Sequence, residues 1–261
     1  MGKKSNLKAI DDETREYINS KMSRNFECYS PYKVGVLNYK IDVKCKNQRQ
    51  KEFYLNLKNS QKEICFGIGS AGTGKSIISI WYALEELKKG DKYKKIIIFV
   101  PTCEASKTLS LGFLKGTLDE KTEVYKASDK NTIIKILDIC ENSSPKDILN
   151  KLIDNNLIEF EFLNFCKGKT YDDSIILVNE AEDFSKNDML LLLTRIGNNS
   201  KVIITGDEKQ VSRNDIKTKD NSGLMHAINK LGNMEEVSVT EFTDDDIVRN
   251  KLITKILKNW D

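Results

Sequence analysis

Short, continuous apolar runs alternate with longer segments of mixed polarity from about residue 47 to the end of the chain. Runs that end in glycine, proline or polar residues are typical of strands buried on both faces of a parallel sheet. These runs span residues 63–69, 94–101, 156–165, 174–183, 201–207 and 235–242. The sequence therefore predicts the strands of one mainly parallel sheet.

The segments between these runs have the 3.6-residue periodicity of amphipathic helices. The predicted helices span residues 48–59, 76–90, 131–140, 186–197, 222–232 and 244–260. Gly90 and Gly197 stand where a glycine would end a helix, and the acids at 244–246 would favour a helix start. Strands that alternate with helices indicate an α/β protein with helices on both faces of its sheet.

The first 45 residues differ from the rest and are predicted to form a small N-terminal extension. They contain a polar, helix-like segment up to about Met22 and a partly alternating stretch, residues 29–44, that could form a short hairpin. The main domain is expected over residues 46–261, a length that suits one domain. Within it, residues 103–155 have the least regular pattern.

One loop between a predicted strand and a predicted helix reads GSAGTGKS, residues 69–76, and fits the P-loop pattern G-x-x-x-x-G-K-[ST]. Glycines let backbone N–H groups turn inward around a polyphosphate, and the start of the next helix adds its dipole and amide donors. Lys75 is expected to reach the β- and γ-phosphates of ATP, and the Ser76 hydroxyl to bind Mg²⁺. The predicted nucleotide-binding residues in this loop are Gly69, Ser70, Ala71, Gly72, Thr73, Gly74, Lys75, Ser76 and Ile77.

Polar residues also follow two later apolar runs, and ligands bind at the carboxyl ends of strands in open α/β sheets. Asn179 and Glu180 end one run. Glu180 is the candidate to polarise the attacking water, and Asn179 occupies the position of a metal ligand. Gly206, Asp207 and Gln210 stand at the end of the run that begins at Lys201, and Gln210 could sense the γ-phosphate through a hydrogen bond. A plain turn would explain this last motif about as well.

Composition narrows the choice of function. The formal net charge is +3 with 31% charged residues, which favours neither a nucleic-acid coat protein nor an acidic tail. One histidine and six cysteines without a C-x-x-C pair argue against a zinc site and for free thiols in a reducing compartment. The sequence contains neither an apolar window as long as a membrane span nor a signal-peptide pattern, so a cytoplasmic protein is expected.

In this order, the motifs resemble those of the PhoH family, ATPases built on the RecA-like core of superfamily 1 helicases. FGIGSAGTGKS resembles the family's F-G-x-G-P-A-G-T-G-K-T, and VPTCEASKTLSLGFLKG is similar to R-P-A-V-E-A-G-x-x-L-G-F-L-P-G. IILVNEAED matches I-L-D-E-A-Q-N, and LLLLTRIGNNSKVIITGDEKQ resembles F-L-T-R-I-G-x-x-S-K-x-V-x-T-G-D-x-x-Q. NSGL and DIVRNKLI are similar to the closing S-G-L and D-V-V-R-H-P-L-V. The resemblance covers about residues 47–261 and implies a RecA-like P-loop fold.

The resemblance implies further site residues. Gln50 resembles the glutamine that reads adenine, with Gln48 as the alternative. Arg249 stands where the family keeps an arginine, and a guanidinium there would neutralise charge on the transferred phosphoryl group. An ion pair of Arg249 with a neighbouring aspartate would explain this residue equally well, and Arg195 is a less favoured alternative.

The chain also departs from the family pattern. Ser70 and Lys115 replace prolines, and Val100 replaces an arginine. Asn179 replaces the aspartate of the metal site; its amide oxygen can accept a bond from a Mg²⁺-bound water but brings no charge, so metal affinity is expected to fall. Since the P-loop lysine and the glutamate after Asn179 are kept, hydrolysis is expected at a reduced rate.

The resemblance implies a Mg²⁺-dependent ATPase that couples hydrolysis to RNA or single-stranded DNA, although no nucleic-acid motif in the sequence supports the second half independently. The alternative is a nucleotide-binding switch or scaffold with little hydrolysis because of Asn179. A small-metabolite kinase would predict an arginine-rich lid and no GDEKQ block. Because the length suits a single RecA-like domain, a homo-oligomer is expected, such as a hexameric ring in which a neighbour supplies Arg249. The composition would suit a phage protein that acts in the host cytoplasm.

Overall fold

The structure is a computed structural model. It describes residues 36–100, 118–211 and 222–248. By their internal contacts the residues divide into two compact units, 1–38 and 39–261. All elements described below belong to the second unit.

Residues 39–45 pack with the main unit instead of forming a strand. Tyr39 is buried, and its hydroxyl donates a hydrogen bond to the carbonyl oxygen of Leu84 at 2.6 Å. No strand is present over residues 36–45, so the described part of the expected hairpin is not formed. The rest of that segment and the polar helix expected up to Met22 lie outside the described residues.

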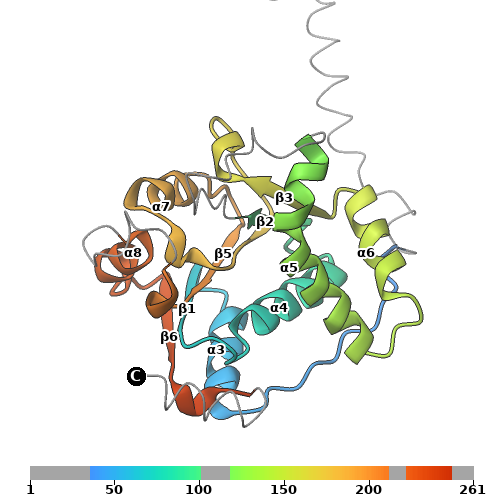
Figure 1. Cartoon of the computed structure of the whole chain (residues 1–261), viewed down its shortest axis with the longest axis horizontal. Helices are drawn as coiled ribbons and strands as arrows, with labels where there is room; N and C mark the ends of the chain where they lie inside the picture. Colours follow the sequence, from blue (N-terminus) through green and yellow to red (C-terminus); the bar gives the residue numbers. More distant parts are fainter. Residues whose placement is uncertain (1–35, 101–117, 212–221, 249–261) are drawn as a thin grey trace, which may run out of the picture. The chain divides into compact units, whose positions relative to one another are not determined.

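A single six-stranded sheet forms the centre of the unit, and every strand pair in it is parallel (Figure 1). The strand order is β3-β2-β4-β5-β1-β6. The strands are β1 (Ile64–Gly69), β2 (Lys95–Val100), β3 (Ile158–Phe162), β4 (Ser174–Val178), β5 (Lys201–Gly206) and β6 (Val237–Phe242). This confirms the predicted parallel α/β sheet.

The apolar runs form strands because helices cover both faces of the sheet, so neither face requires polar residues. Every residue of β4 and β5 is buried. Side chains from the central strands join one apolar cluster with the helices α7 (Lys186–Leu193) and α8 (Gly223–Leu231). Phe66, Ile176 and Ile204 are fully buried in this cluster. This burial fixes the register that brings the strand ends together at one edge.

Helices lie on both sides of the sheet (Figure 1). One side carries α3 (Gln48–Lys58), α4 (Lys75–Lys89), α5 (Leu118–Ile139) and α6 (Pro145–Asp154), and the other carries α7 (Lys186–Leu193) and α8 (Gly223–Leu231). Short 3₁₀ turns are η1 (Leu163–Phe165), η2 (Ala181–Asp183), η3 (Glu208–Gln210) and η4 (Asp244–Asp246). None of the helices in the described ranges is long and apolar enough to cross a membrane.

Two helix ends show how local signals compare with tertiary contacts. Gly90 ends α4 in the left-handed conformation, as predicted. The expectation for Gly197 was wrong, because α7 ends at Leu193 and its C-cap is Thr194. A Cβ at Gly197 would lie 2.7 Å from the carbonyl oxygen of Tyr171. Gly197 is therefore explained by close backbone approach before β5.

Other helices differ from the predicted ranges. The segment predicted over residues 131–140 is the second half of the longer α5, and α6 was not predicted although Pro145 occupies a favourable first-turn position. The helix predicted over residues 244–260 does not begin at its expected start. Residues 244–246 form the 3₁₀ turn η4 and Ile247 is extended, while residues 249–260 lie outside the described part.

The connections between the strands explain why the carboxyl ends of the central strands are open to a ligand. The chain leaves β1 through α4 on one face, whereas it leaves β5 toward α8 on the opposite face (Figure 1). β1 and β5 are hydrogen-bonded neighbours. Their carboxyl ends therefore form the switch point at which open α/β sheets bind ligands.

Candidate nucleotide-binding site

The loop between β1 and α4 has a backbone that requires glycine. Gly69, Gly72 and Gly74 have φ angles of 120°, 83° and 93°, which residues with a Cβ rarely adopt. A Cβ at Gly69 would also lie 1.9 Å from the carbonyl oxygen of Phe242, and one at Gly74 would lie 2.7 Å from Nε2 of Gln50. The glycines of the motif are thus explained by conformation and by space.

Lys75 is the first residue of α4 and turns its side chain back into the loop. Its Nζ donates to the carbonyl oxygens of Gly69 at 2.6 Å and Ser70 at 2.8 Å, and the residue is 8% exposed. Ser76 follows in the first turn and is half-buried. The loop therefore combines the ammonium group of Lys75, the amide donors of a helix N-terminus and a glycine-rich backbone. This set of donors fits a polyphosphate.

Gln50 on α3 supports this loop from the side. The side chain is 3% exposed; its Nε2 donates to the Thr73 carbonyl at 2.8 Å, and its Oε1 accepts from the Lys46 amide at 2.7 Å. Gln48, the competing choice, is exposed. The structure brings Gln50 to the loop, where both ends of its amide bind backbone groups, and the adenine-reading role stays a prediction.

Asp207 connects the end of β5 to the same loop. Its Oδ2 accepts hydrogen bonds from the Ala71 amide at 3.1 Å and from Nε2 of Gln210 at 3.0 Å. Gln210 is exposed at the end of η3. The motif that contains Asp207 and Gln210 therefore lies beside the P-loop. Asp207 supports the loop, and Gln210 lies next to that contact.

The segment that follows β6, near the end of the sequence, also contacts the P-loop. The Ser70 hydroxyl donates to the carboxylate of Asp244, and the Val248 amide donates to the Gly72 carbonyl at 3.1 Å. Val248 is the last described residue before Arg249. Arg249 itself lies outside the described residues, so its predicted role stays a prediction.

Asn179 lies at the end of β4 and is bonded on both sides of its amide. Its Nδ2 donates to Oδ1 of Asp129 at 2.6 Å, and its Oδ1 accepts from the Thr205 hydroxyl at 2.9 Å. Asp129 comes from α5 and is 7% exposed. Burial raises the pKa of the Asp129 carboxyl to about 6; the bond from Asn179 opposes this rise and the charge of Glu180 adds to it. The position predicted for a metal ligand thus holds an amide paired with a buried acid.

Glu180 and Glu182 follow Asn179 and differ in environment. Glu180 is exposed and has a left-handed backbone, with φ of 56°. Glu182 is 3% exposed, and its Oε2 accepts from the Asp207 amide at 3.1 Å. Burial, followed by a hydrogen bond with Glu180 and the charge of Glu180, holds the pKa of Glu182 well above its usual range. Glu182 therefore favours the neutral form beside the predicted catalytic Glu180.

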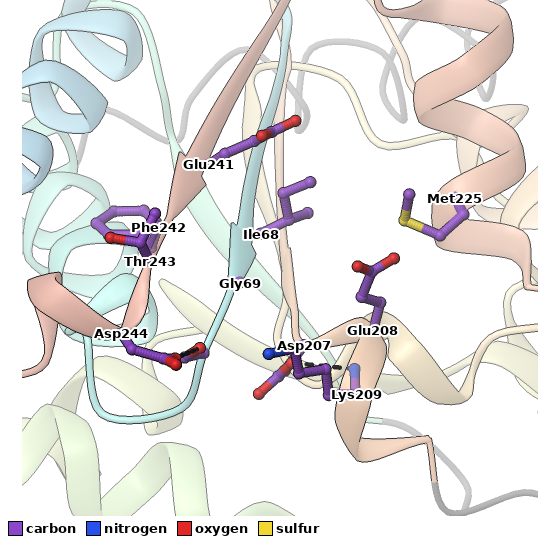
Figure 2. A pocket seen from close by; sticks show the side chains of 11 residues that line it. Ile68, Gly69, Asp207, Glu208, Lys209, Met225, Glu241, Phe242, Thr243 and Asp244 are labelled. Carbon is purple, nitrogen blue, oxygen red and sulfur yellow. Dashed lines mark hydrogen bonds between the residues drawn. The ribbon is translucent and has the colours of Figure 1, made fainter. Parts of the chain in front are cut away.

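A pocket of about 320 Å³ lies beside the P-loop, at the ends of β1 and β6 and against η3 and α8 (Figure 2). Its lining contains the acids Asp207, Glu208, Glu241 and Asp244 and a single basic residue, Lys209. This charge disfavours a phosphate chain. A phosphate chain would suit the loop around Lys75 better than this pocket.

The structure does not bring Arg195 to the P-loop of the same chain. Its Nη1 donates to the Lys169 carbonyl at 3.2 Å, in the connection that leads into β4. The Tyr171 amide in turn donates to the Arg195 carbonyl at 3.0 Å. Arg195 is therefore placed where chain segments enter the sheet, whereas the P-loop leaves the carboxyl end of β1.

Two residues of the site, Glu182 and Asp129, were not predicted from the sequence. Glu182 follows the Asn179–Glu180 pair closely, and its place in an acidic run after a strand was the only available signal. Asp129 had no signal, because it lies within a polar stretch of α5, 50 residues before Asn179. Only the packing of α5 against the core reveals this contact.

Since β5 is the one strand between β1 and β4, the P-loop and the acidic end of β4 lie close together at the same edge of the sheet. The fold and this site define an α/β protein of the RecA-like P-loop class. The family model for the PhoH-like protein matches residues 42–261. The chain belongs to this family.

Curated relatives of the chain are named PhoH-like protein or protein PhoH. The chain is 34% identical over 219 residues to a PhoH-like protein of Bacillus subtilis, a match that covers 84% of this chain and 64% of the relative. It is 33% identical over 194 residues to a PhoH-like protein of Mycobacterium leprae, covering 74% and 52% of the two chains. Protein PhoH of Escherichia coli is 29% identical over 196 residues, covering 75% and 52%. The chain thus spans between about half and two thirds of these relatives.

Proposed function

We propose that the chain binds ATP together with Mg²⁺ and hydrolyses it. The observation that carries this proposal is the loop around Lys75, whose ammonium is held inside a turn that only glycine permits, at the start of a helix. These groups would bind the negative charge of the phosphates and orient them in line.

The other residues suit a hydrolytic step. Mg²⁺, when bound, supplies positive charge against the phosphates, and Ser76 and Asn179 are the residues proposed to hold it. Glu180 is exposed next to this position and would orient a water and accept its proton. Gln210, next to Asp207 and the P-loop, would sense the terminal phosphate.

The experiment is phosphate release by the purified wild type and by Lys75→Ala, each with and without single-stranded RNA or DNA. We expect Lys75→Ala to lower the rate by at least about a hundredfold. Lys89→Ala is the matched control, because Lys89 lies on the same helix and its side chain is 41% exposed. Equal rates for wild type and Lys75→Ala would contradict the proposal.

The second candidate is a nucleotide-dependent switch with little hydrolysis. The observation in its favour is that Asn179 uses both ends of its amide in contacts with Asp129 and Thr205. This function predicts tight binding of ATP with no phosphate release. A gain of turnover in Asn179→Asp would identify position 179 as the cause.

We also propose RNA or single-stranded DNA as the partner, and a homo-oligomer, such as a hexameric ring, in which a neighbouring copy supplies Arg249. We expect this oligomer to act in the cytoplasm. If a phage encodes the chain, that is the cytoplasm of the host cell. Stimulation of phosphate release by RNA or single-stranded DNA would support the nucleic-acid partner. Sedimentation with and without ATP tests the homo-oligomer, and a monomer with full activity would contradict it.

A further inference from the structure

Asp129 has an environment that a carboxylate rarely occupies without a cation. It is 7% exposed, and within the described ranges no lysine or arginine forms an ion pair with it. Its hydrogen-bond partner there is the neutral amide of Asn179, at 2.6 Å. Burying an ionised carboxylate is costly unless a cation or a proton compensates its charge. A bound cation next to Asp129 would supply this compensation.

The place of Asp129 in the fold is the place where a cation is expected. The carboxylate contacts Asn179 at the carboxyl end of β4, and Glu180 follows directly. The amide oxygen of Asn179 accepts from Thr205 on the adjacent β5, and this network fixes the amide with its N–H₂ group toward the acid. The contact holds the Asp129 carboxylate against position 179.

On the basis of the proposed function, we infer that Asp129 supplies the negative charge of the Mg²⁺ site, and that it and Asn179 act as one acid–amide pair. In this pair the charge comes from α5 and the amide from β4. Carboxylate oxygens are preferred ligands of Mg²⁺, either directly or through a bound water. The site then keeps a fixed negative charge, on Asp129, although Asn179 is neutral.

The exchange of the two side chains tests this inference. Three variants are needed: Asp129→Asn, Asn179→Asp, and the double variant Asp129→Asn/Asn179→Asp. The first keeps the shape of the side chain and removes the charge, and the double variant moves the charge to β4. Asp138→Asn is the matched control, because Asp138 is an exposed acid on the same helix α5.

The measurement is equilibrium binding of a fluorescent, non-hydrolysable ATP analogue during titration with Mg²⁺, together with Mn²⁺ binding followed by electron paramagnetic resonance. We expect Asp129→Asn to raise the metal concentration for half-maximal binding at least about tenfold. The double variant should return to within about threefold of the wild type, and Asp138→Asn should equal the wild type. Binding in EDTA should change little in any variant.

Three outcomes separate the inference from the function on which it rests. If wild type binds the analogue with Mg²⁺ and Asp129→Asn has the same metal dependence, the inference is wrong and the proposed function stands. The same conclusion follows if the double variant is as weak as Asp129→Asn. If wild type binds no nucleotide with or without metal, the proposed function itself fails.

Discussion

The carboxylate of Asp207 accepts a hydrogen bond from the backbone amide of Ala71, 136 residues earlier in the sequence, at 3.1 Å. The contact joins the end of β5 to the middle of the P-loop. Asp207 is 6% exposed and also accepts from the Lys209 amide at 3.1 Å. One acid therefore fixes the position of the loop relative to the sheet.

Asp207→Ala is expected to lower the free energy of unfolding by about 2 kcal/mol, because the partly buried donors of Ala71, Lys209 and Gln210 lose a charged acceptor. Urea denaturation followed by circular dichroism measures this change. Glu208→Ala is the control, since it removes the same charge from the next, exposed residue. Equal midpoints for the two variants would show that the contact with Ala71 contributes nothing to stability.

Gly74→Ala is expected to lower affinity for an ATP analogue at least about tenfold, since the new Cβ would meet Nε2 of Gln50 at 2.7 Å in a backbone of positive φ. Gly168→Ala is the control, because Gly168 has φ of 80° but no neighbouring atom within 4 Å of the place that a Cβ would take. It should lower the free energy of unfolding by about 1 kcal/mol and leave affinity unchanged. Unaltered affinity in Gly74→Ala would contradict a tightly defined loop.

Glu182→Gln is expected to flatten the pH dependence of stability. The pKa of Glu182 is raised in the folded state, so the unfolded chain releases this proton at a lower pH than the folded chain does. The stabilising effect of the proton is complete below the ordinary pKa of glutamate and is lost as the pH rises toward the raised pKa. The neutral amide of glutamine removes this loss.

Thermal unfolding of wild type and Glu182→Gln at pH 5 and pH 8 measures the difference, and the variant should gain stability relative to wild type at the higher pH. Glu235→Gln is the control on an exposed acid. Parallel pH profiles for wild type and Glu182→Gln would show that the acid is not held neutral.

Gly67→Ala is expected to lower the free energy of unfolding by about 2 kcal/mol, because a Cβ on β1 would lie 2.7 Å from the ring of Phe53 on α3. Phe53 is fully buried and packs edge-on against Phe242 at 5.7 Å between ring centroids. In Gly67→Ala/Phe53→Leu the smaller side chain relieves the contact. The loss in the double variant should be smaller than the sum of the two single losses by at least about 1 kcal/mol, as chemical denaturation can measure; strict additivity would contradict the packing explanation.

The sheet could be predicted from the sequence because the runs of its central strands β1, β2, β4 and β5 are largely apolar on both faces, a pattern typical of a covered parallel sheet. The P-loop could be predicted because its glycines and lysine are local in sequence. Gly197 misled the prediction of α7, since the same residue type that ends helices also allows close backbone approach, and sequence alone does not separate the two. Asp129 depends on a contact between α5 and β4, which no local pattern records.

The supports of the P-loop come from both ends of the domain: Gln50 before the motif, and Asp207 and Val248 long after it. Contacts so distant in sequence form slowly in folding, since a long stretch of chain must be ordered before they close. During synthesis the motif emerges from the ribosome well before its last supports. The proposed affinity for nucleotide would therefore report that the domain has completed its fold, and a nascent or truncated chain with an intact motif would lack part of the scaffold that holds it.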